Sequence, residues 1–228
     1  MIIYGKQVCR YAIEKHPQRI RRIYVHKQAR LNEIDTARCQ AKIETLDARR
    51  AQSLSRGGNH QGILVELDEI SLVAFSEMKH ASFLVVLDGL TDVGNIGAIV
   101  RTAYALGVEG VIACGVKQLP TAAIARTSAG ALLDMPLAVV PNVADVLHEL
   151  GQVGFTRYGA AMDGEVVERV DFAPKRVLVL GSEGKGLSKK AMDKLDRKVS
   201  VTMQRSFDSL NVHAAAAIIV HRMSYAVK

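Results

Sequence analysis

Apolar or largely apolar runs of strand length alternate with amphipathic stretches through the second half of the chain. These runs occupy residues 83–88 (FLVVLD), 108–114, 135–140, 153–160, 176–181 and 199–203. Helical periodicity fills the intervals at about 95–106, 143–150 and 188–195, and continues after the last run at about 210–226. Continuously apolar strands are typical of a parallel sheet buried on both faces. The alternation therefore predicts an α/β fold, a parallel sheet with helices on both faces.

The first 70 residues show a shorter and separate pattern. Helices are predicted at about 5–16, 31–39 and 48–55, and strands at 20–26, 42–46 and 63–67. The polar stretch that follows, 68–82, has no strong periodicity and is typical of a connection. We therefore predict a small α/β domain at 1–70, a linker at 71–82 and a larger domain at 83–228.

Basic residues are concentrated at the N-terminal end. The formal net charge of the 228 residues is +7, and residues 1–30 hold eight basic residues and one acidic residue, which accounts for all of it. A local basic patch is typical of a surface that binds a polyanion, either nucleic acid or an anionic membrane surface. The alternative is an ordinary solvated, charged face.

Composition argues against several other classes of protein. The longest purely apolar run, 214–220, is far shorter than the roughly 20 residues that span a bilayer, and no signal-peptide pattern opens the chain. Cys9, Cys39 and Cys114 form no CxxC pair, so we expect buried free cysteines, a reducing cytosol, and neither a disulfide framework nor a metal site. With 5% aromatic residues and no Trp, a sheet that stacks bases on aromatic rings is disfavoured.

Ligands of parallel α/β sheets bind at loops that leave the carboxyl ends of the strands, so these loops are the places to look for a site. The first loop leads into GNIGAIVRTAYALG, at residues 94–107. Asn95 either caps the following helix or belongs to a site. Arg101 is the single charge within an apolar helical stretch, which predicts that it needs a partner or a ligand.

The second loop, LGSEGKGLS at 180–188, directly follows a predicted strand. Gly181, Gly184 and Gly186 allow backbone amides to approach a ligand, although the loop is also interpretable as a flexible turn. It matches neither the Walker A pattern nor GxGxxG, which disfavours a phosphate-loop nucleotidase. Glu183 lies at its centre, where no core needs a carboxylate.

The third loop, within residues 201–220, leads into the last predicted helix. Ser209 is a candidate cap for that helix, and the residues from 210 to 220 form its apolar body. His213 is expected to pack on or near the helix, because no partner in the sequence favours a ligand role.

In this order, the three loops resemble the three signature motifs of the SpoU (TrmH-like) family of RNA ribose 2′-O-methyltransferases. DVGNIGAIVRTAYALG is similar to the first motif, GSEGKGLS to the second and SLNVHAAAAI to the third. RTSAGALLDMPL at 126–137 and NHQG near the end of the first domain add to the resemblance, which spans essentially the whole chain. It implies an N-terminal substrate-binding domain, a C-terminal trefoil knot, S-adenosylmethionine as cofactor, and a homodimer with the active site near the subunit interface.

By motif position, the resemblance implies two sets of site residues. The residues lining the cofactor would be Gly181, Val201 and Leu210, and the catalytic set would be Asn95, Arg101, Glu183, Ser209 and Asn211. Arg101 would bind the adjacent phosphate and stabilise the developing alkoxide, since a guanidinium with a pKa above about 12 is a poor base. Asn95 would orient Arg101 or the ribose, and Glu183 would position Arg101 or the nucleotide. Ser209 and Asn211 would hold the substrate and the third loop.

The chain departs from the family pattern in the third motif. Members often carry Ile-Pro-Met where this sequence has Val201-Thr202-Met203, a change that keeps an apolar wall. They often carry Ser-Val where it has His213-Ala214, so a bulkier side chain stands near the substrate.

The expected activity is methylation of a guanosine ribose in 23S ribosomal RNA, in the cytoplasm. The alternatives are a tRNA ribose as the target, or a non-catalytic RNA-binding or ribosome-assembly protein on the same fold. The basic N-terminal segment would then dock RNA through Arg19, Arg21 and Arg22. No membrane and no metal are expected to take part.

Overall fold

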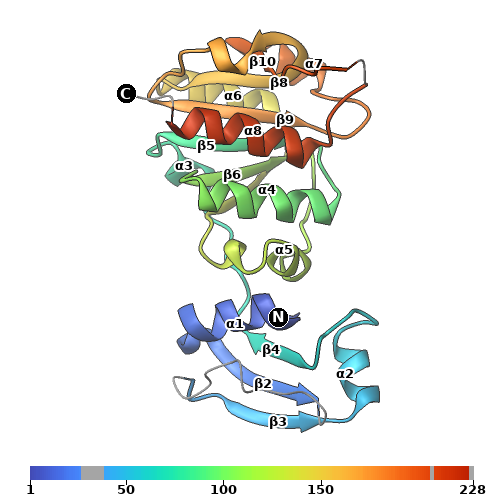
Figure 1. The fold of residues 1–228 in the computed structure, drawn as a ribbon. Helices are drawn as coiled ribbons and strands as arrows, with labels where there is room; N and C mark the ends of the chain where they lie inside the picture. The colour runs from blue at the N-terminus through green and yellow to red at the C-terminus, as the bar shows by residue number, and fades with distance from the viewer. Residues whose placement is uncertain (27–38, 206–207, 226–228) are drawn as a thin grey trace. The chain divides into compact units, whose positions relative to one another are not determined.

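The computed structural model describes residues 1–26, 39–205 and 208–225, and these residues form two compact units (Figure 1). Unit 1 consists of Met1–Ser71 together with Pro120–Asp134. Unit 2 consists of Leu72–Leu119 and the described residues from Met135 onward. The first division lies next to the boundary that we predict at residue 70. The inclusion of Pro120–Asp134 in unit 1 has no counterpart in the sequence pattern.

Unit 1 is built on a four-stranded mixed sheet in the order β1-β4-β2-β3. Its strands are β1 (Ile2–Tyr4), β2 (Ile20–His26), β3 (Lys42–Leu46) and β4 (Ile63–Leu67), with β2 and β3 parallel and the other pairs antiparallel. Its helices are α1 (Lys6–Lys15), α2 (Ala48–Leu54), α5 (Thr121–Thr127) and the short 3-10 helices Pro17–Arg19 and Ala131–Leu133. The predicted elements correspond to α1, α2 and β2 to β4. Residues 31–38 of the predicted helix at 31–39 lie outside the described residues.

Unit 2 contains a six-stranded sheet in the order β10-β8-β9-β5-β6-β7, and every neighbouring pair is parallel. Its strands are β5 (Phe83–Asp88), β6 (Gly110–Cys114), β7 (Leu137–Val140), β8 (Thr156–Val166), β9 (Arg176–Gly181) and β10 (Arg197–Ser200). The predicted parallel α/β sheet is confirmed. Strand order defines neighbours and not the threading of the chain, so the trefoil knot stays a prediction.

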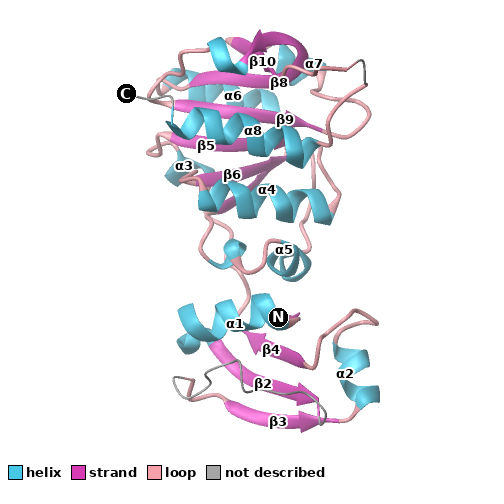
Figure 2. Cartoon of the chain, viewed as in Figure 1, coloured by secondary structure: helices cyan, strands magenta, loops and turns pink. Residues whose placement is uncertain are grey.

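Helices cover both faces of this sheet, as expected (Figure 2). On one face, α4 (Val93–Ala105) and α8 (Val212–Tyr225) lie side by side. On the other face lies α6 (Val143–Gln152), with the short helices α3 (Phe75–Met78) and α7 (Lys189–Met192) packed against the same apolar cluster. The 3-10 helix Val167–Arg169 follows β8.

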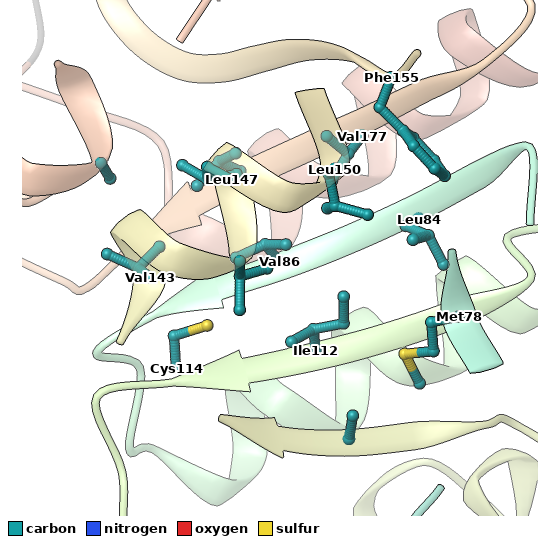
Figure 3. Packing of buried hydrophobic residues seen from close by; sticks show 14 of the residues in the cluster. Met78, Leu84, Val86, Ile112, Cys114, Val143, Leu147, Leu150, Phe155 and Val177 are labelled. Carbon is teal, nitrogen blue, oxygen red and sulfur yellow. The ribbon is translucent and has the colours of Figure 1, made fainter. Parts of the chain in front are cut away.

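A cluster of buried apolar side chains fills the space between α6 and the sheet (Figure 3). Leu84 and Val86 of β5 lie in one buried cluster with side chains of α6 such as Leu147, which is fully buried. Burial of one such side chain stabilises the fold by about 1.5–3 kcal/mol. All six residues of β5 are buried, because helices shield both faces of this central strand.

The segment 71–82 differs from the linker that the polar pattern predicts. It contains α3, and Met78 is buried in the apolar cluster beneath the sheet. Val73 and Phe75 also pack against the cluster. Four helical residues are too few to show a 3.6-residue period, so the sequence pattern gives no sign of this helix.

The cysteines only partly match their predicted burial. Cys9 and Cys114 are buried and Cys39 is half-buried, and all three thiols are free. Burial, with a smaller contribution from Asp88, raises the pKa of Cys114 to about 12. Among the described residues, no group of three or more His, Cys, Asp or Glu side chains is arranged to hold a metal ion. Within those same residues, no helix has the length and apolar character needed to cross a membrane.

An ion pair joins β8 to the residue that precedes β10. Asp196 Oδ2 accepts hydrogen bonds from the backbone N and the Nε of Arg157, each at 2.8 Å. The Arg157 hydrogen bond lowers the pKa of Asp196. The folded state therefore favours the ionised carboxylate. This stabilisation is present above the ordinary aspartate pKa and is lost as the pH falls through the lowered value.

Asp196→Asn is accordingly expected to destabilise unit 2 at neutral pH and to have little effect in acid. The pair is partly exposed, so we expect a loss of about 1 kcal/mol, or a Tm lower by about 2–4 °C. Thermal unfolding of both proteins at pH 7 and near pH 3 measures the difference. Asp193→Asn is the control, because among the described residues the side chain of Asp193 forms no ion pair. An equal loss for Asp196→Asn at both pH values would contradict this account.

Candidate active site

A cleft of about 900 Å³ lies in unit 2 beside the loop that follows β9. It is lined by residues of β8, by that loop, by the segment after β10 and by the start of α8. Six of the residues assigned from the motifs contribute to its walls: Gly181, Glu183, Val201, Ser209, Leu210 and Asn211. Asn95 and Arg101 are not among the lining residues.

The loop after β9 is a tight turn held by its own backbone. Ser182 N donates to Gly186 O at 3.1 Å, and Gly186 N donates to Ser182 O at 2.9 Å. Gly184 and Gly186 have φ values of +76° and +65°, a region that glycine enters without steric cost. At Gly181, a Cβ atom would stand 2.1 Å from the backbone carbon of Gly186. The glycines of this motif therefore shape one wall of the cleft.

Asn95 is not the cap of α4, which corrects one of the two interpretations that the sequence allows. Asp92 is the cap, since its Oδ1 accepts a hydrogen bond from Asn95 N at 2.7 Å. The Asn95 side chain is buried in the first turn, and its Nδ2 donates to Glu183 Oε1 at 2.9 Å. Asn95 therefore belongs to a polar cluster of side chains.

Glu183 joins all three motifs in that cluster. Its Oε1 also accepts a hydrogen bond from Asn211 Nδ2, at 2.8 Å. Asn211 Oδ1 accepts from His213 N at 2.9 Å, so Asn211, and not Ser209, caps the start of α8. Ser209 is exposed and lines the cleft.

Arg101 lies apart from this cluster. It is exposed on α4, and within residues 1–26, 39–205 and 208–225 its guanidinium has no hydrogen bond or ion pair. Arg101 follows Asn95 by six residues in α4. At about 100° of rotation per residue, the two side chains are separated by about 240° around the helix axis. Within one chain, neither Asn95 nor Glu183 therefore orients Arg101, which differs from one of the roles implied by the motifs.

His213 is the residue that the sequence analysis missed. We expected it to pack on the last helix, and it does lie on α8. Its Nδ1, however, lies 3.2 Å from Asn95 Oδ1. The sequence placed it in the third motif, two residues after Asn211, but the contact with Asn95 depends on how α8 packs beside α4.

The three arginines assigned to RNA binding all have partners within unit 1. Arg19 donates at 3.3 Å to two backbone carbonyl oxygens, which leave its charge uncompensated. Arg21 pairs with Asp68 at 2.7 Å and Arg22 with Glu44 at 3.4 Å. Both pairs are exposed to solvent. An exposed ion pair contributes little to stability, so an RNA phosphate can compete with the carboxylate for the arginine.

The fold and the cleft define a two-domain protein whose larger domain has a cleft at the carboxyl end of a parallel sheet, where ligands of α/β proteins typically bind. Comparison with protein families gives two matches. Residues 82–221 match the SpoU rRNA methylase family, and residues 2–72 match the substrate-binding domain of RNA 2′-O ribose methyltransferases. The chain belongs to the SpoU rRNA methylase family. The resemblance drawn from the three motifs is thereby confirmed, and the chain is an RNA methyltransferase.

Curated relatives match over most of their length. The 23S rRNA (guanosine-2'-O-)-methyltransferase RlmB of Bordetella pertussis is 32% identical over 217 residues, covering 90% of this chain and 89% of the relative. The protein of the same name from Yersinia pestis is 31% identical over 235 residues, covering 95% and 94%. The solved structure of the SpoU methyltransferase AviRb from Streptomyces viridochromogenes, in complex with the cofactor AdoMet, has a TM-score of 0.72 at 24% identity. That alignment covers 98% of this chain and 89% of AviRb.

Proposed function

We propose that this protein transfers a methyl group from S-adenosylmethionine to a ribose 2′-hydroxyl of ribosomal RNA, at a guanosine of the 23S molecule. The observation that carries the proposal is the convergence of Asn95, Glu183 and Asn211, one from each motif, beside the cleft. The printed names of the relatives support 23S RNA as the substrate. Because ribosomal RNA is the proposed substrate, we place the enzyme in the cytoplasm.

The cleft fits S-adenosylmethionine in its chemistry. Val201, Leu210 and Met162 give apolar walls for a flat base, and the backbone of the turn after β9 gives polar groups for the charged end. Because no Cβ fits at Gly181, backbone forms this wall. When bound, the cofactor supplies a methyl group on a sulfonium, which is a good electrophile.

The side chains of this protein then have to hold the 2′ oxygen in line with that methyl group and to help it lose its proton. Arg101 binds the phosphate next to the ribose and stabilises the negative charge that develops on the oxygen. The proton leaves to a phosphate oxygen or to water. Asn95, Glu183, Ser209 and Asn211 hold the nucleotide and the third motif loop.

A homodimer fits the exposed position of Arg101. Helices α4 and α8 lie side by side and both carry exposed apolar side chains, namely Tyr104, Ile218 and Tyr225. An apolar face of this kind is typical of a protein–protein interface. A second copy of the chain on this face would bring Arg101 to a shared active site. Sedimentation velocity is expected to give a dimer, and a monomer would contradict this part of the proposal.

Methylation of defined transcripts tests the activity. The protein is incubated with S-adenosylmethionine labelled in its methyl group and with a 23S RNA transcript or a mixture of tRNA transcripts. We expect label in one guanosine ribose of the 23S transcript. Label in tRNA alone would support a tRNA target, and a calorimetric titration without cofactor binding would support a non-catalytic RNA-binding protein. Either result would contradict the proposal.

Replacement of Arg19, Arg21 and Arg22 by Gln is expected to weaken RNA binding and its dependence on salt. Each phosphate contact releases counterions, so loss of two or three contacts lowers the slope of log K against log salt by about 2. RNA-binding titrations at salt concentrations from about 50 to about 300 mM measure this slope. Salt screens phosphate contacts over this range. The control replaces Lys189, Lys190 and Lys194 in unit 2 by Gln. An unchanged slope in the arginine variant would reject this docking surface.

A further inference from the structure

Two amide side chains of the active-site cluster are each held between Glu183 and His213. Asn211 donates its Nδ2–H to Glu183 Oε1 and accepts from the backbone N of His213 through Oδ1. Asn95 donates its Nδ2–H to the same Oε1, and its Oδ1 lies 3.2 Å from His213 Nδ1. His213 therefore completes both pairs, once through its backbone and once through its imidazole.

The order of donors and acceptors determines which ring nitrogen of His213 carries a proton. A carboxylate accepts hydrogen bonds and donates none, so Asn95 has to present its NH₂ group to Glu183. The carbonyl oxygen of Asn95 then faces His213 Nδ1. Two acceptors at this distance would repel each other. Nδ1 therefore has to be the donor, and the neutral imidazole carries its proton on Nδ1.

We propose that His213 is a positioning residue for methyl transfer, which it serves by donating Nδ1–H to Asn95 Oδ1. This proposal rests on the proposed function for the identity of the reaction, and on the hydrogen bonds for the role of the residue. Asn95 is 8% exposed, so loss of this donor leaves a buried carbonyl oxygen without its partner. The amide is then free to rotate away from Glu183, and the cluster loses its single arrangement.

The accessibility of His213 makes the role separable from folding. The residue as a whole is exposed and sits in the first turn of α8, so a smaller side chain neither opens a core cavity nor breaks the helix. The backbone hydrogen bond to Asn211 remains in any substitution other than proline, which has no N–H. A side chain without a donor at this position, such as alanine, therefore removes the restraint on Asn95 alone.

The first test measures the tautomer directly and needs no RNA. Long-range ¹H–¹⁵N correlation spectra of the ¹⁵N-labelled protein distinguish a proton on Nδ1 from one on Nε2. We expect the Nδ1–H form for neutral His213 in the native protein, and the ordinary Nε2–H form in Asn95→Ala. A native protein with the proton on Nε2 would overturn the proposal.

The second test is kinetic and uses matched variants. His213→Ala is expected to lower kcat about fivefold, the equivalent of one hydrogen bond of ordinary strength made in the transition state, with little change in the KM for S-adenosylmethionine. His213→Asn is expected to restore most of the rate, because its Nδ2–H takes the place of Nδ1–H. His148→Ala is the control, because His148 is exposed on α6, on the other face of the sheet.

The outcomes separate this proposal from the proposed function. If His213→Asn is no faster than His213→Ala while both melt at the native temperature, the positioning role is wrong. If the native protein methylates no RNA but shows the Nδ1–H tautomer, the proposed function fails, while the hydrogen bond by which His213 holds Asn95 stands.

Discussion

Arg101→Ala is expected to abolish methyl transfer, with kcat lower by about a hundredfold or more. The guanidinium is a poor base, and its contribution is a fixed positive charge beside the developing alkoxide. Removal of one such electrostatic contact typically costs a factor of about 10²–10³ in kcat. Arg101 does not line the cleft assigned to the cofactor, so the affinity for S-adenosylmethionine should remain nearly unchanged.

Three measurements make the Arg101 result interpretable. Single-turnover methylation gives the rate, and calorimetry gives the cofactor affinity. Thermal unfolding shows that the fold persists, since Arg101 is exposed and, among the described residues, makes no hydrogen bond or ion pair. Arg101→Lys keeps the positive charge but loses the planar guanidinium. Its methylation rate should lie between those of the native protein and Arg101→Ala. A rate for Arg101→Ala above a tenth of the native rate would contradict the assignment.

Gly181→Ala is expected to weaken cofactor binding strongly. A Cβ at this position would meet only backbone atoms, the carbon and oxygen of Gly186 at 2.1 and 2.2 Å and the nitrogen of Leu187 at 2.3 Å. Backbone cannot turn aside as a flexible side chain can, so the whole turn after β9 has to move. That turn is a wall of the cleft. We expect the affinity for S-adenosylmethionine to fall by tenfold or more, with about 1–3 kcal/mol lost in stability.

Gly184→Ala is the matched control in the same turn. A Cβ at Gly184 meets nothing within 4 Å, but its φ of +76° makes alanine strained. Alanine there is expected to cost about 1 kcal/mol in stability and little cofactor affinity. Calorimetric titration and thermal unfolding of both variants separate lack of space from backbone strain. Equal cofactor affinities in the two variants would show that the close approach at Gly181 is not what shapes the cleft.

The sequence predicted the larger domain in most of its detail because burial on both faces leaves a strong local signal. The largely apolar run at 83–88 is β5 without change, and the run at 176–181 is β9. Short elements left no such signal. Helix α3 has four residues and β1 has three, so neither completes enough of a period to be recognised.

The candidate site was predicted as three loops and not as a set of contacts. Position at the carboxyl ends of parallel strands, together with the motif resemblance, selected Asn95, Glu183 and Asn211. The hydrogen bonds between them join residues 88 and 28 positions apart, so no local pattern contains them. The interpretation of Asn95 as a helix cap, one of two left open, and of Ser209 as a candidate cap was wrong for the same reason. Several nearby polar side chains can serve as a cap, and only the backbone path selects Asp92 and Asn211.

The sequence by itself determined the parallel α/β sheet, the family and the residues that carry its motifs, because periodicity and motif identity are properties of neighbours along the chain. Only the tertiary structure decided how those residues are used. The packing of α8 beside α4 brings His213 to Asn95, and the turn of α4 carries Arg101 away from both. A hydrogen bond requires its donor and acceptor to be placed to within a few tenths of an ångström. That precision is reached only once the helices and the sheet have packed.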